Sequence, residues 1–296
     1  MTTRRVVVGY DGSECSRMAL TWGMRAAQAR HVPLLIAHAG YTPTAPVAGF
    51  VTLVEPDPQA MIAADEEMLA AAAHEARREV PDVQVDTASV TGAVVPTLLE
   101  LMADADLAVV GHRGLGTFRE LLVGSTAVQL ASHVHCPLVV VRSSEYVEPG
   151  PEAGRIVVGV DGSTLAGAAA GFAFEEAALR GCGLTAVYAW QVPTLDTYGW
   201  GPEITEPMVT SHRGHADEAL AQSLASWTEK FPAVPVRHRV ESGEAAAALV
   251  RASAGAEVLV VGARGTGGFG ALRLGSVAHT LLHHAHSAVA VIRTHR

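Results

Sequence analysis

The fold of this chain is decided by one stretch that occurs twice. It first reads VVGHRGLGTFRELLVGS at residues 109–125, and it returns as VVGARGTGGFGALRLGS at residues 260–276. Each copy has an apolar run, a glycine, two residues, a second glycine, nine residues and then Gly-Ser. The apolar run predicts a parallel strand buried on both faces. Glycines directly after it let the backbone approach a ligand closely. We therefore predict a strand, a glycine loop and a helix in each copy.

The Gly-Ser that starts each helix predicts an anion site. Backbone N–H groups are free at a helix N-terminus, and the positive end of the helix dipole lies there. A tight turn is the alternative for one copy, but two copies with the same spacing favour a phosphate-binding loop. The loop is no Walker A motif, because no Gly-Lys-Ser/Thr follows. It also differs from the Rossmann fingerprint, because it follows the fourth predicted strand rather than the first.

The repeat extends over nearly the whole chain. Residues 5–13 (RVVVGYDGS) match residues 155–163 (RIVVGVDGS). Asp11 and Asp161 are 150 positions apart (161 − 11), whereas Gly111 and Gly262 are 151 apart (262 − 111). The chain therefore consists of two whole repeated domains, and the second contains one net inserted residue. We expect a first domain over 1–145, a linker with Pro, Gly and Glu over 146–154, and a second domain over 155–296.

Strands and helices alternate in both halves. The expected strands are 4–10, 33–39, 83–90, 107–111 and 138–141, then 155–160, 184–190, 236–241, 258–262 and 288–293. The expected helices are 13–30, 61–79, 94–103 and 125–133, then 165–180, 212–231, 245–254 and 276–285. Asp65, Glu66 and Glu67 are assigned to the outer turns of the second helix. This alternation predicts a doubly wound, five-stranded parallel sheet in each half. A ligand is expected where the ends of the first and fourth strands meet.

Composition narrows the possible partners and compartment. The net charge of −9 argues against a nucleic-acid partner, which would require a basic face. The cysteines, Cys15, Cys136 and Cys182, are odd in number and far apart, as expected in a reducing cytoplasm. The N-terminus lacks the apolar region of a signal peptide, and no apolar run approaches the roughly 18 residues of a membrane span. We expect a cytoplasmic protein without membrane insertion.

Together, the Val-Gly-x-Asp-Gly-Ser start, the glycine spacing and the order of elements resemble the universal stress protein family, in its tandem, ATP-binding form. The resemblance covers residues 4–293. It implies a flavodoxin-like open sheet with strand order 3-2-1-4-5, close to the adenine-nucleotide α-hydrolase-like folds. It also implies one ATP per domain, with Mg²⁺ or Mn²⁺ on the phosphates.

The resemblance also implies site residues, position by position. In the first half these are Gly9, Tyr10, Asp11, Ala39, Val90, Gly111, His112, Arg113, Gly114, Leu115, Gly116, Thr117, Gly124, Ser125 and Thr126. In the second half they are Gly159, Val160, Asp161, Val240, Gly262, Ala263, Arg264, Gly265, Thr266, Gly267, Gly268, Gly275, Ser276 and Val277. Ala39 and Val90 would lie near the adenine, with Trp190 and Val240 as their expected counterparts.

Several of these residues have a second interpretation. Asp11 and Asp161 either bind a phosphate-bound metal or cap the following helix, and both roles can hold together. Arg113 and Arg264 occupy equal loop positions, so they are the better candidates for phosphate contacts. His112 aligns with Ala263 in the other copy of the repeat, which argues against His112 as an essential base. The histidine clusters at 133–135 and 283–286 fit polar helix ends better than a metal site.

Catalysis has little support in the sequence. No Gly-x-Ser-x-Gly elbow is present, and Glu120 aligns with Ala271. We therefore expect an ATP-dependent regulator in stress response without fast catalysis; the alternatives are a slow ATPase or nucleotidyl-transfer enzyme, or a scaffold in which the nucleotide is structural. The apolar last strands favour a homodimer, or pairing within one chain, and the long loops at 40–58 and 191–211 would face an unknown protein partner.

Overall fold

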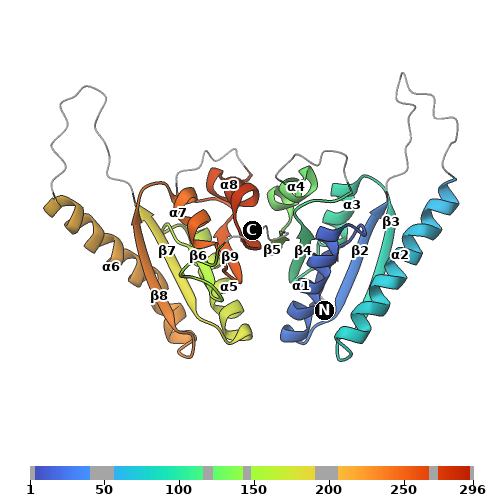
Figure 1. The fold of residues 1–296 in the computed structure, drawn as a ribbon, viewed down its shortest axis with the longest axis horizontal. Helices are drawn as coiled ribbons and strands as arrows, with labels where there is room; N and C mark the ends of the chain where they lie inside the picture. Colours follow the sequence, from blue (N-terminus) through green and yellow to red (C-terminus); the bar gives the residue numbers. More distant parts are fainter. Residues whose placement is uncertain are drawn as a thin grey trace, which may run out of the picture. The chain divides into compact units, whose positions relative to one another are not determined.

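The computed structural model describes residues 4–40, 57–115, 123–142, 148–190, 206–266 and 273–293, and for 206–213 it describes the backbone only. The chain divides into two compact units between residues 143 and 144 (Figure 1). In its described part, no helix is both long enough and apolar enough to cross a membrane.

The first unit is the parallel, doubly wound sheet that the sequence predicts. Its strands are β1 (Val6–Gly9), β2 (Leu34–Gly40), β3 (Val85–Thr91), β4 (Leu107–Gly111) and β5 (Leu138–Val141), in the order β3-β2-β1-β4-β5. Its helices are α1 (Glu14–Arg30), α2 (Pro58–Glu79), α3 (Val94–Leu101) and α4 (Ser125–His133). Helix α1 packs beside α2, and α3 packs beside α4. The order confirms the flavodoxin-like prediction, with the switch point between β1 and β4.

The second unit repeats this arrangement. Its strands are β6 (Ile156–Gly159), β7 (Leu184–Trp190), β8 (Val236–Ser242), β9 (Val258–Gly262) and β10 (Val289–Ile292), in the order β8-β7-β6-β9-β10. Its helices are α5 (Thr164–Arg180), α6 (Glu206–Lys230), α7 (Ala245–Ala252) and α8 (Ser276–His284). The predicted elements all occur; about half of their ends match and nearly all the others shift by one to three residues, but α6 begins at Glu206, six residues before the predicted start at 212 and inside the predicted loop 191–211.

The turn between the first strand and first helix has the same geometry in both units. Gly12 and Gly162 adopt φ angles of 77° and 78°, which favour glycine because it lacks a Cβ. The next residue caps the helix: Ser13 Oγ accepts from Ser16 N at 3.2 Å, and Ser163 Oγ accepts from Ala166 N at 3.1 Å. These turns explain why the Asp-Gly-Ser sequence recurs.

The strand register corrects two expected counterparts. Gly9 pairs with Ala37 and Gly159 with Val187, so Ala39 corresponds to Ala189 rather than to Trp190. In the neighbouring pair of strands, Ala39 lies opposite Val90, and Ala189 lies opposite Glu241. Val90 therefore corresponds to Glu241 rather than to Val240. Equivalent residues of the two units are thus 150 positions apart up to the second strand and 151 positions apart from the third strand on. The net insertion therefore falls between these two strands.

The described part of the predicted linker, residues 148–154, packs on the second unit. Gly150 N donates to Ala254 O at 3.0 Å, and Gly154 N donates to Gly255 O at 2.9 Å. Glu152 is only 6% exposed, and it pairs with Arg239 at 3.3 Å and accepts a hydrogen bond from Thr185 at 2.5 Å. These contacts attach residues 148–154 to the second sheet.

Candidate functional site

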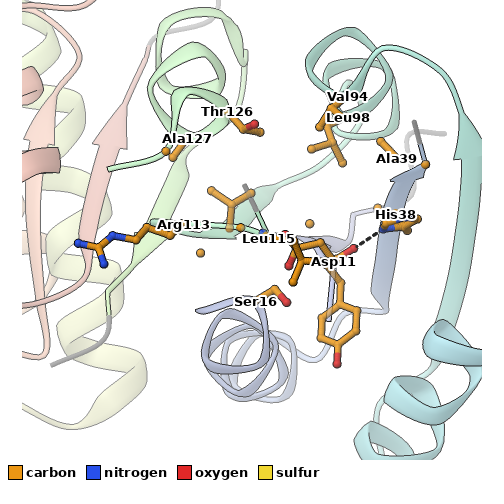
Figure 2. A pocket seen from close by; sticks show the side chains of 18 of the residues that line it. Asp11, Ser16, His38, Ala39, Val94, Leu98, Arg113, Leu115, Thr126 and Ala127 are labelled. Atoms are coloured by element: carbon orange, nitrogen blue, oxygen red, sulfur yellow. Dashed lines mark hydrogen bonds between the residues drawn. The ribbon is translucent and has the colours of Figure 1, made fainter. Parts of the chain in front are cut away.

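A cavity of about 810 Å³ lies in the first unit at the carboxyl ends of β1, β2 and β4 (Figure 2). Val94 and Leu98 of α3 line it, and α4 contributes Thr126 and Ala127. Parallel strands place their ligands at this edge of the sheet, beside the switch point. The cavity therefore occupies the position predicted for the ligand.

Asp11 connects the two loops that border this cavity. Its Oδ1 accepts from Ser13 N at 3.0 Å, within the turn that begins α1. Its Oδ2 accepts from Leu115 N at 3.1 Å, in the glycine loop after β4. One carboxylate thus holds together segments that are about a hundred residues apart in the chain. Ser13, rather than Asp11, is the N-cap of α1, so the interpretation of Asp11 as the helix cap is wrong; Asp11 instead fixes the turn before the helix with one oxygen and the glycine loop with the other.

The second unit contains the same connection. Asp161 Oδ1 accepts from Ser163 N at 3.0 Å, and Oδ2 accepts from Thr266 N at 2.8 Å. The identical geometry in two units of different sequence indicates a shared requirement of the site.

Glycine is needed where the loop meets this aspartate. A Cβ on Gly114 would collide with Asp11 Oδ2, and a Cβ on Gly265 would collide with Asp161 Oδ2. A Cβ on Gly111 would lie 2.7 Å from the backbone carbon of Cys15, where α1 crosses the loop. The recurring Gly-x2-Gly spacing therefore lets the loop pack closely on the aspartate and on the first helix, and its approach to a ligand stays a prediction.

The N-terminus of α4 opens onto the cavity without a side-chain cap. The N-cap residue of α4 is Gly124 and that of α8 is Gly275, and a glycine has no side chain that could cap the helix. The loop is closed instead through the backbone, because Gly124 N donates to His112 O at 2.7 Å and Gly275 N donates to Ala263 O at 2.8 Å. Ser125, Thr126 and Ala127 line the cavity, so the first turn of α4 presents its N–H end to it.

His112 is enclosed beneath the loop. It is 2% exposed, and its Nδ1 has no hydrogen-bond partner among the described residues. Burial, followed by the nearby charges of Arg142 and Arg113, lowers the pKa of His112 to about 4. The imidazole is therefore neutral at physiological pH. The Arg113 side chain borders the cavity and points away from Asp11 and His38 in Figure 2.

The structure brings most of the predicted first-half residues together. Those that line the cavity are Gly9, Tyr10, Asp11, Ala39, Gly111, His112, Arg113, Gly114, Leu115, Gly124, Ser125 and Thr126. Val90 is 40% exposed and lies beside Ala39 in the sheet, outside this lining. Gly116, Thr117, Gly267 and Gly268 lie outside the described residues, as do most of the two long loops predicted to face a partner.

The sequence reasoning missed the wall formed by β2 and α2. His38, Met61 and Asp65 line the cavity there. Asp65 was assigned to an outer turn of its helix, and this assignment is wrong. The available signal was its spacing: Asp65 lies four residues before the buried Leu69, on the side of α2 that faces the sheet.

Within the described ranges, no group of three or more His, Cys, Asp or Glu side chains is arranged to hold a metal ion. In the first histidine cluster, His133 Nδ1 bonds Gln129 O at 2.8 Å within its own helix. Burial raises the pKa of the neighbouring Cys136 to about 12, so its thiol is not an anionic ligand at neutral pH.

Comparison with known proteins gives a consistent result in sequence and in structure. The sequence profile of the universal stress protein family matches residues 2–142 and again residues 152–293. A universal stress protein of Mycobacterium tuberculosis is 34% identical over 293 residues, which cover 97% of this chain and 96% of that protein. One from Mycobacterium bovis is 34% identical over 299 residues, with the same shares.

Solved structures share the fold at lower identity. A universal stress protein from Archaeoglobus fulgidus superposes with a TM-score of 0.68 at 17% identity, covering 98% of this chain and 96% of its own. A protein described as a putative universal stress protein from Pseudomonas aeruginosa gives 0.62 at 17% identity, with 98% and 92% covered.

Proposed function

The chain belongs to the universal stress protein family, and from that premise we propose that each of its two units binds one ATP and acts as a nucleotide-dependent regulator. The observation that carries this proposal is the recurring connection between the aspartate and the glycine loop. In both units it fixes the loop while leaving the following helix N-terminus uncapped. A helix end of this kind is suited to phosphate oxygens.

The residues present fit a nucleotide. The phosphates would lie against the first turn of α4 and the glycine loop, where added Cβ atoms would occupy space needed by the backbone and by Asp11. The nucleoside would extend across the end of β1, past Gly9 and Tyr10, toward β2. The equivalent positions in the second unit are Gly159 and Val160, with Gly262, Gly275, Ser276 and Val277 on the phosphate side.

A divalent cation on the phosphates is part of the proposal. Mg²⁺ commonly binds one or two carboxylates together with substrate phosphates and water. Asp11 and Asp161 are the acidic groups at the predicted phosphate end, and a carboxylate that accepts two N–H bonds retains further lone pairs. We assign them to the cation, Mg²⁺ or Mn²⁺, through the phosphates.

The geometry favours binding of the nucleotide over its hydrolysis. The described carboxylates that line the first cavity are Asp11 and Asp65. Asp11 holds the two loops together, and Asp65 aligns with Ala216 in the second unit, because α2 and α6 end at residues that are 151 positions apart. Of the described acids of the first cavity, only Asp11 therefore has an acidic counterpart, Asp161, and both are engaged by the loops and the proposed cation. A regulator that changes its surface with nucleotide occupancy fits this arrangement, with a homodimer or another protein as its partner.

The test is to identify what the purified protein carries and does. Denaturation should release ATP or ADP, identified by chromatography, and equilibrium dialysis should return ATP to the emptied protein. ADP formation, followed over hours, should stay well below about 1 s⁻¹, the lower end of ordinary enzyme turnover. Faster turnover would make the protein an enzyme, and failure to retain or bind any nucleotide would refute the proposal.

A further inference from the structure

The nucleoside end of the first cavity contains a histidine–aspartate pair. His38 Nδ1 lies 2.7 Å from Tyr10 O, and His38 Nε2 lies 3.3 Å from Asp65 Oδ1 (Figure 2 shows the first of these contacts). The His38 and Asp65 side chains are 12% and 27% exposed, and both residues line the cavity. Because Tyr10 O can only accept, His38 Nδ1 must donate, which fixes the orientation of the ring. With Nδ1 donating to Tyr10 O, Nε2 can donate to an ionised Asp65 only when the ring is the doubly protonated imidazolium, and the ring lies against Asp65 from one side.

Gly40 makes room for the other oxygen of this carboxylate. A Cβ at Gly40 would lie 2.7 Å from Asp65 Oδ2. Asp65 thus sits closely against the end of β2, with its Oδ1 toward His38 and its Oδ2 toward Gly40. An ionised carboxylate only accepts hydrogen bonds, so a ligand group that reaches Asp65 must be a donor.

The second unit has different residues at the same two places. Leu34 and Leu184 begin equivalent strands, so the position of His38 is held by Tyr188. Helices α2 and α6 end alike, since Val80 N donates to Ala76 O and Phe231 N donates to Trp227 O, an offset of 151 (231 − 80). The same offset aligns the buried Leu69 with the buried Leu220, and Asp65 with Ala216. The pair thus belongs to the first unit and has no counterpart at these positions in the second.

The place of the pair in the sheet indicates which part of a nucleotide it meets. Strand β1 lies between β4 and β2. Phosphates at the β4 side, beside α4, leave the opposite end of the ligand at β2. Strand spacing of about 4.8 Å puts that end on the order of 10 Å away. The base, rather than the phosphates, reaches β2 and α2.

We propose that Asp65, positioned by His38, accepts a hydrogen bond from an amino group on the base, so that the first unit selects an amino-bearing base and the second unit does so less. This inference rests on the proposed nucleotide binding and adds a specificity to one of the two sites. It predicts that two sites with the same phosphate loop differ in the base they accept.

The experiment uses the full chain with the second site disabled by Gly265→Ala. Equilibrium dialysis compares ATP with purine-riboside triphosphate, which lacks the amino group, and with 2′-deoxy-ATP, which lacks a ribose hydroxyl. The first site should bind ATP about tenfold or more tightly than purine-riboside triphosphate, because a hydrogen bond to a charged acceptor is worth at least that factor. Asp65→Ala should reduce this preference to about twofold or less.

Two further variants act as controls. Glu66→Ala removes the same charge from the exposed neighbour on α2, and it should keep the preference for ATP. His38→Tyr installs the residue of the second unit, and it should lower the preference in the same direction as Asp65→Ala. A merely structural role for His38 would weaken both nucleotides equally and leave their ratio unchanged.

The outcomes separate this inference from the function beneath it. If ATP binds the first site but Asp65→Ala leaves the ratio of ATP to purine-riboside triphosphate unchanged, the inference is wrong and nucleotide binding stands. If Asp65→Ala erases discrimination against 2′-deoxy-ATP instead, Asp65 contacts the ribose and the assignment to the base is overturned. If the unmodified chain binds no ATP, the proposed function itself fails.

Discussion

At the residue scale, one difference between the two copies of the loop is His112 in the first and Ala263 in the second. Both are buried, at 2% and 1% exposed, but only one can titrate. The repeat made this difference visible in the sequence, and it argued against His112 as a shared base. Burial was beyond the sequence, because it depends on how the loop folds over the end of β4. The low pKa that burial causes at His112 has a consequence for stability.

Replacing His112 with the alanine of the other copy should make the first unit less sensitive to acid. The pKa of His112 is about 4 in the folded unit and 6.5 ordinarily. Between pH 4 and 6.5, His112 is therefore protonated in the unfolded chain but neutral in the folded unit. Stability is therefore lost as the pH falls from 6.5 toward 4, by up to about 3 kcal/mol. Urea unfolding at several pH values should show this slope in the unmodified chain and a weaker one in His112→Ala.

His135→Ala is the control for this comparison, because it removes an exposed histidine of the same unit. It should keep the acid slope of the unmodified chain. Equal slopes in the unmodified chain and His112→Ala would show that this histidine is accessible to protons in the folded state.

At the element scale, strands and helices were predictable because apolar runs and Ala-rich segments alternate clearly. Counterparts across the repeat were harder. Ala39 and Val90 were each matched one residue away from their true partners, because the site of the net insertion is hidden in the long loop or helix between their strands. The face of α2 was also missed, since alanine at 8 of its 22 positions leaves little contrast between the sheet side and the solvent side. Asp65 was misplaced for that reason.

Two glycines within the first helices of the units should respond in opposite ways to alanine. A Cβ on Gly23 of α1 would collide with Val8 of β1, whereas a Cβ on Gly167 of α5 meets nothing within 4 Å. Gly23→Ala should therefore destabilise the first unit by about 1–3 kcal/mol through overpacking. Gly167→Ala should stabilise the second unit by about 0.5–1 kcal/mol, because alanine loses less backbone entropy on folding. Denaturant midpoints test both, and shifts of the same sign would contradict the packing described.

Residues 148–154, the segment before β6, should contribute strongly to the stability of the second unit. Glu152 is buried against Arg239 and Thr185, and burial lowers the pKa of the adjoining Arg155. Glu152→Ala leaves Arg239 its second partner, Glu241, but it removes the acceptor of Thr185 and the carboxylate beside Arg155, so it should cost about 2 kcal/mol. Glu152→Gln, which can still accept from Thr185, should cost less. Thermal unfolding of both variants measures this, and a loss below about 0.5 kcal/mol in Glu152→Ala would mean that the segment is not held by this residue.

At the scale of the whole molecule, the sequence predicted two doubly wound units and the position of a ligand site in each. Those predictions followed from topology, which is set by the order of elements and by right-handed crossovers. The difference between the sites did not follow from topology. It depends on side chains from β2 and α2 that meet only in the folded sheet, as His38 and Asp65 do. The two units thus have matching glycine loops and different side chains on the wall formed by the second strand and second helix.

The central claim is that each unit holds one nucleotide in its glycine loop, and counting nucleotides per chain tests it most directly. Saturation with ATP in equilibrium dialysis should give two sites in the unmodified chain. Gly114→Ala and Gly265→Ala should each leave one site, because the added Cβ drives Asp11 or Asp161 away from the loop. The double variant should leave none, and Gly167→Ala, as the control, should keep two. Two sites retained in either single variant, with the fold intact by circular dichroism, would contradict the assignment of the nucleotide to these loops.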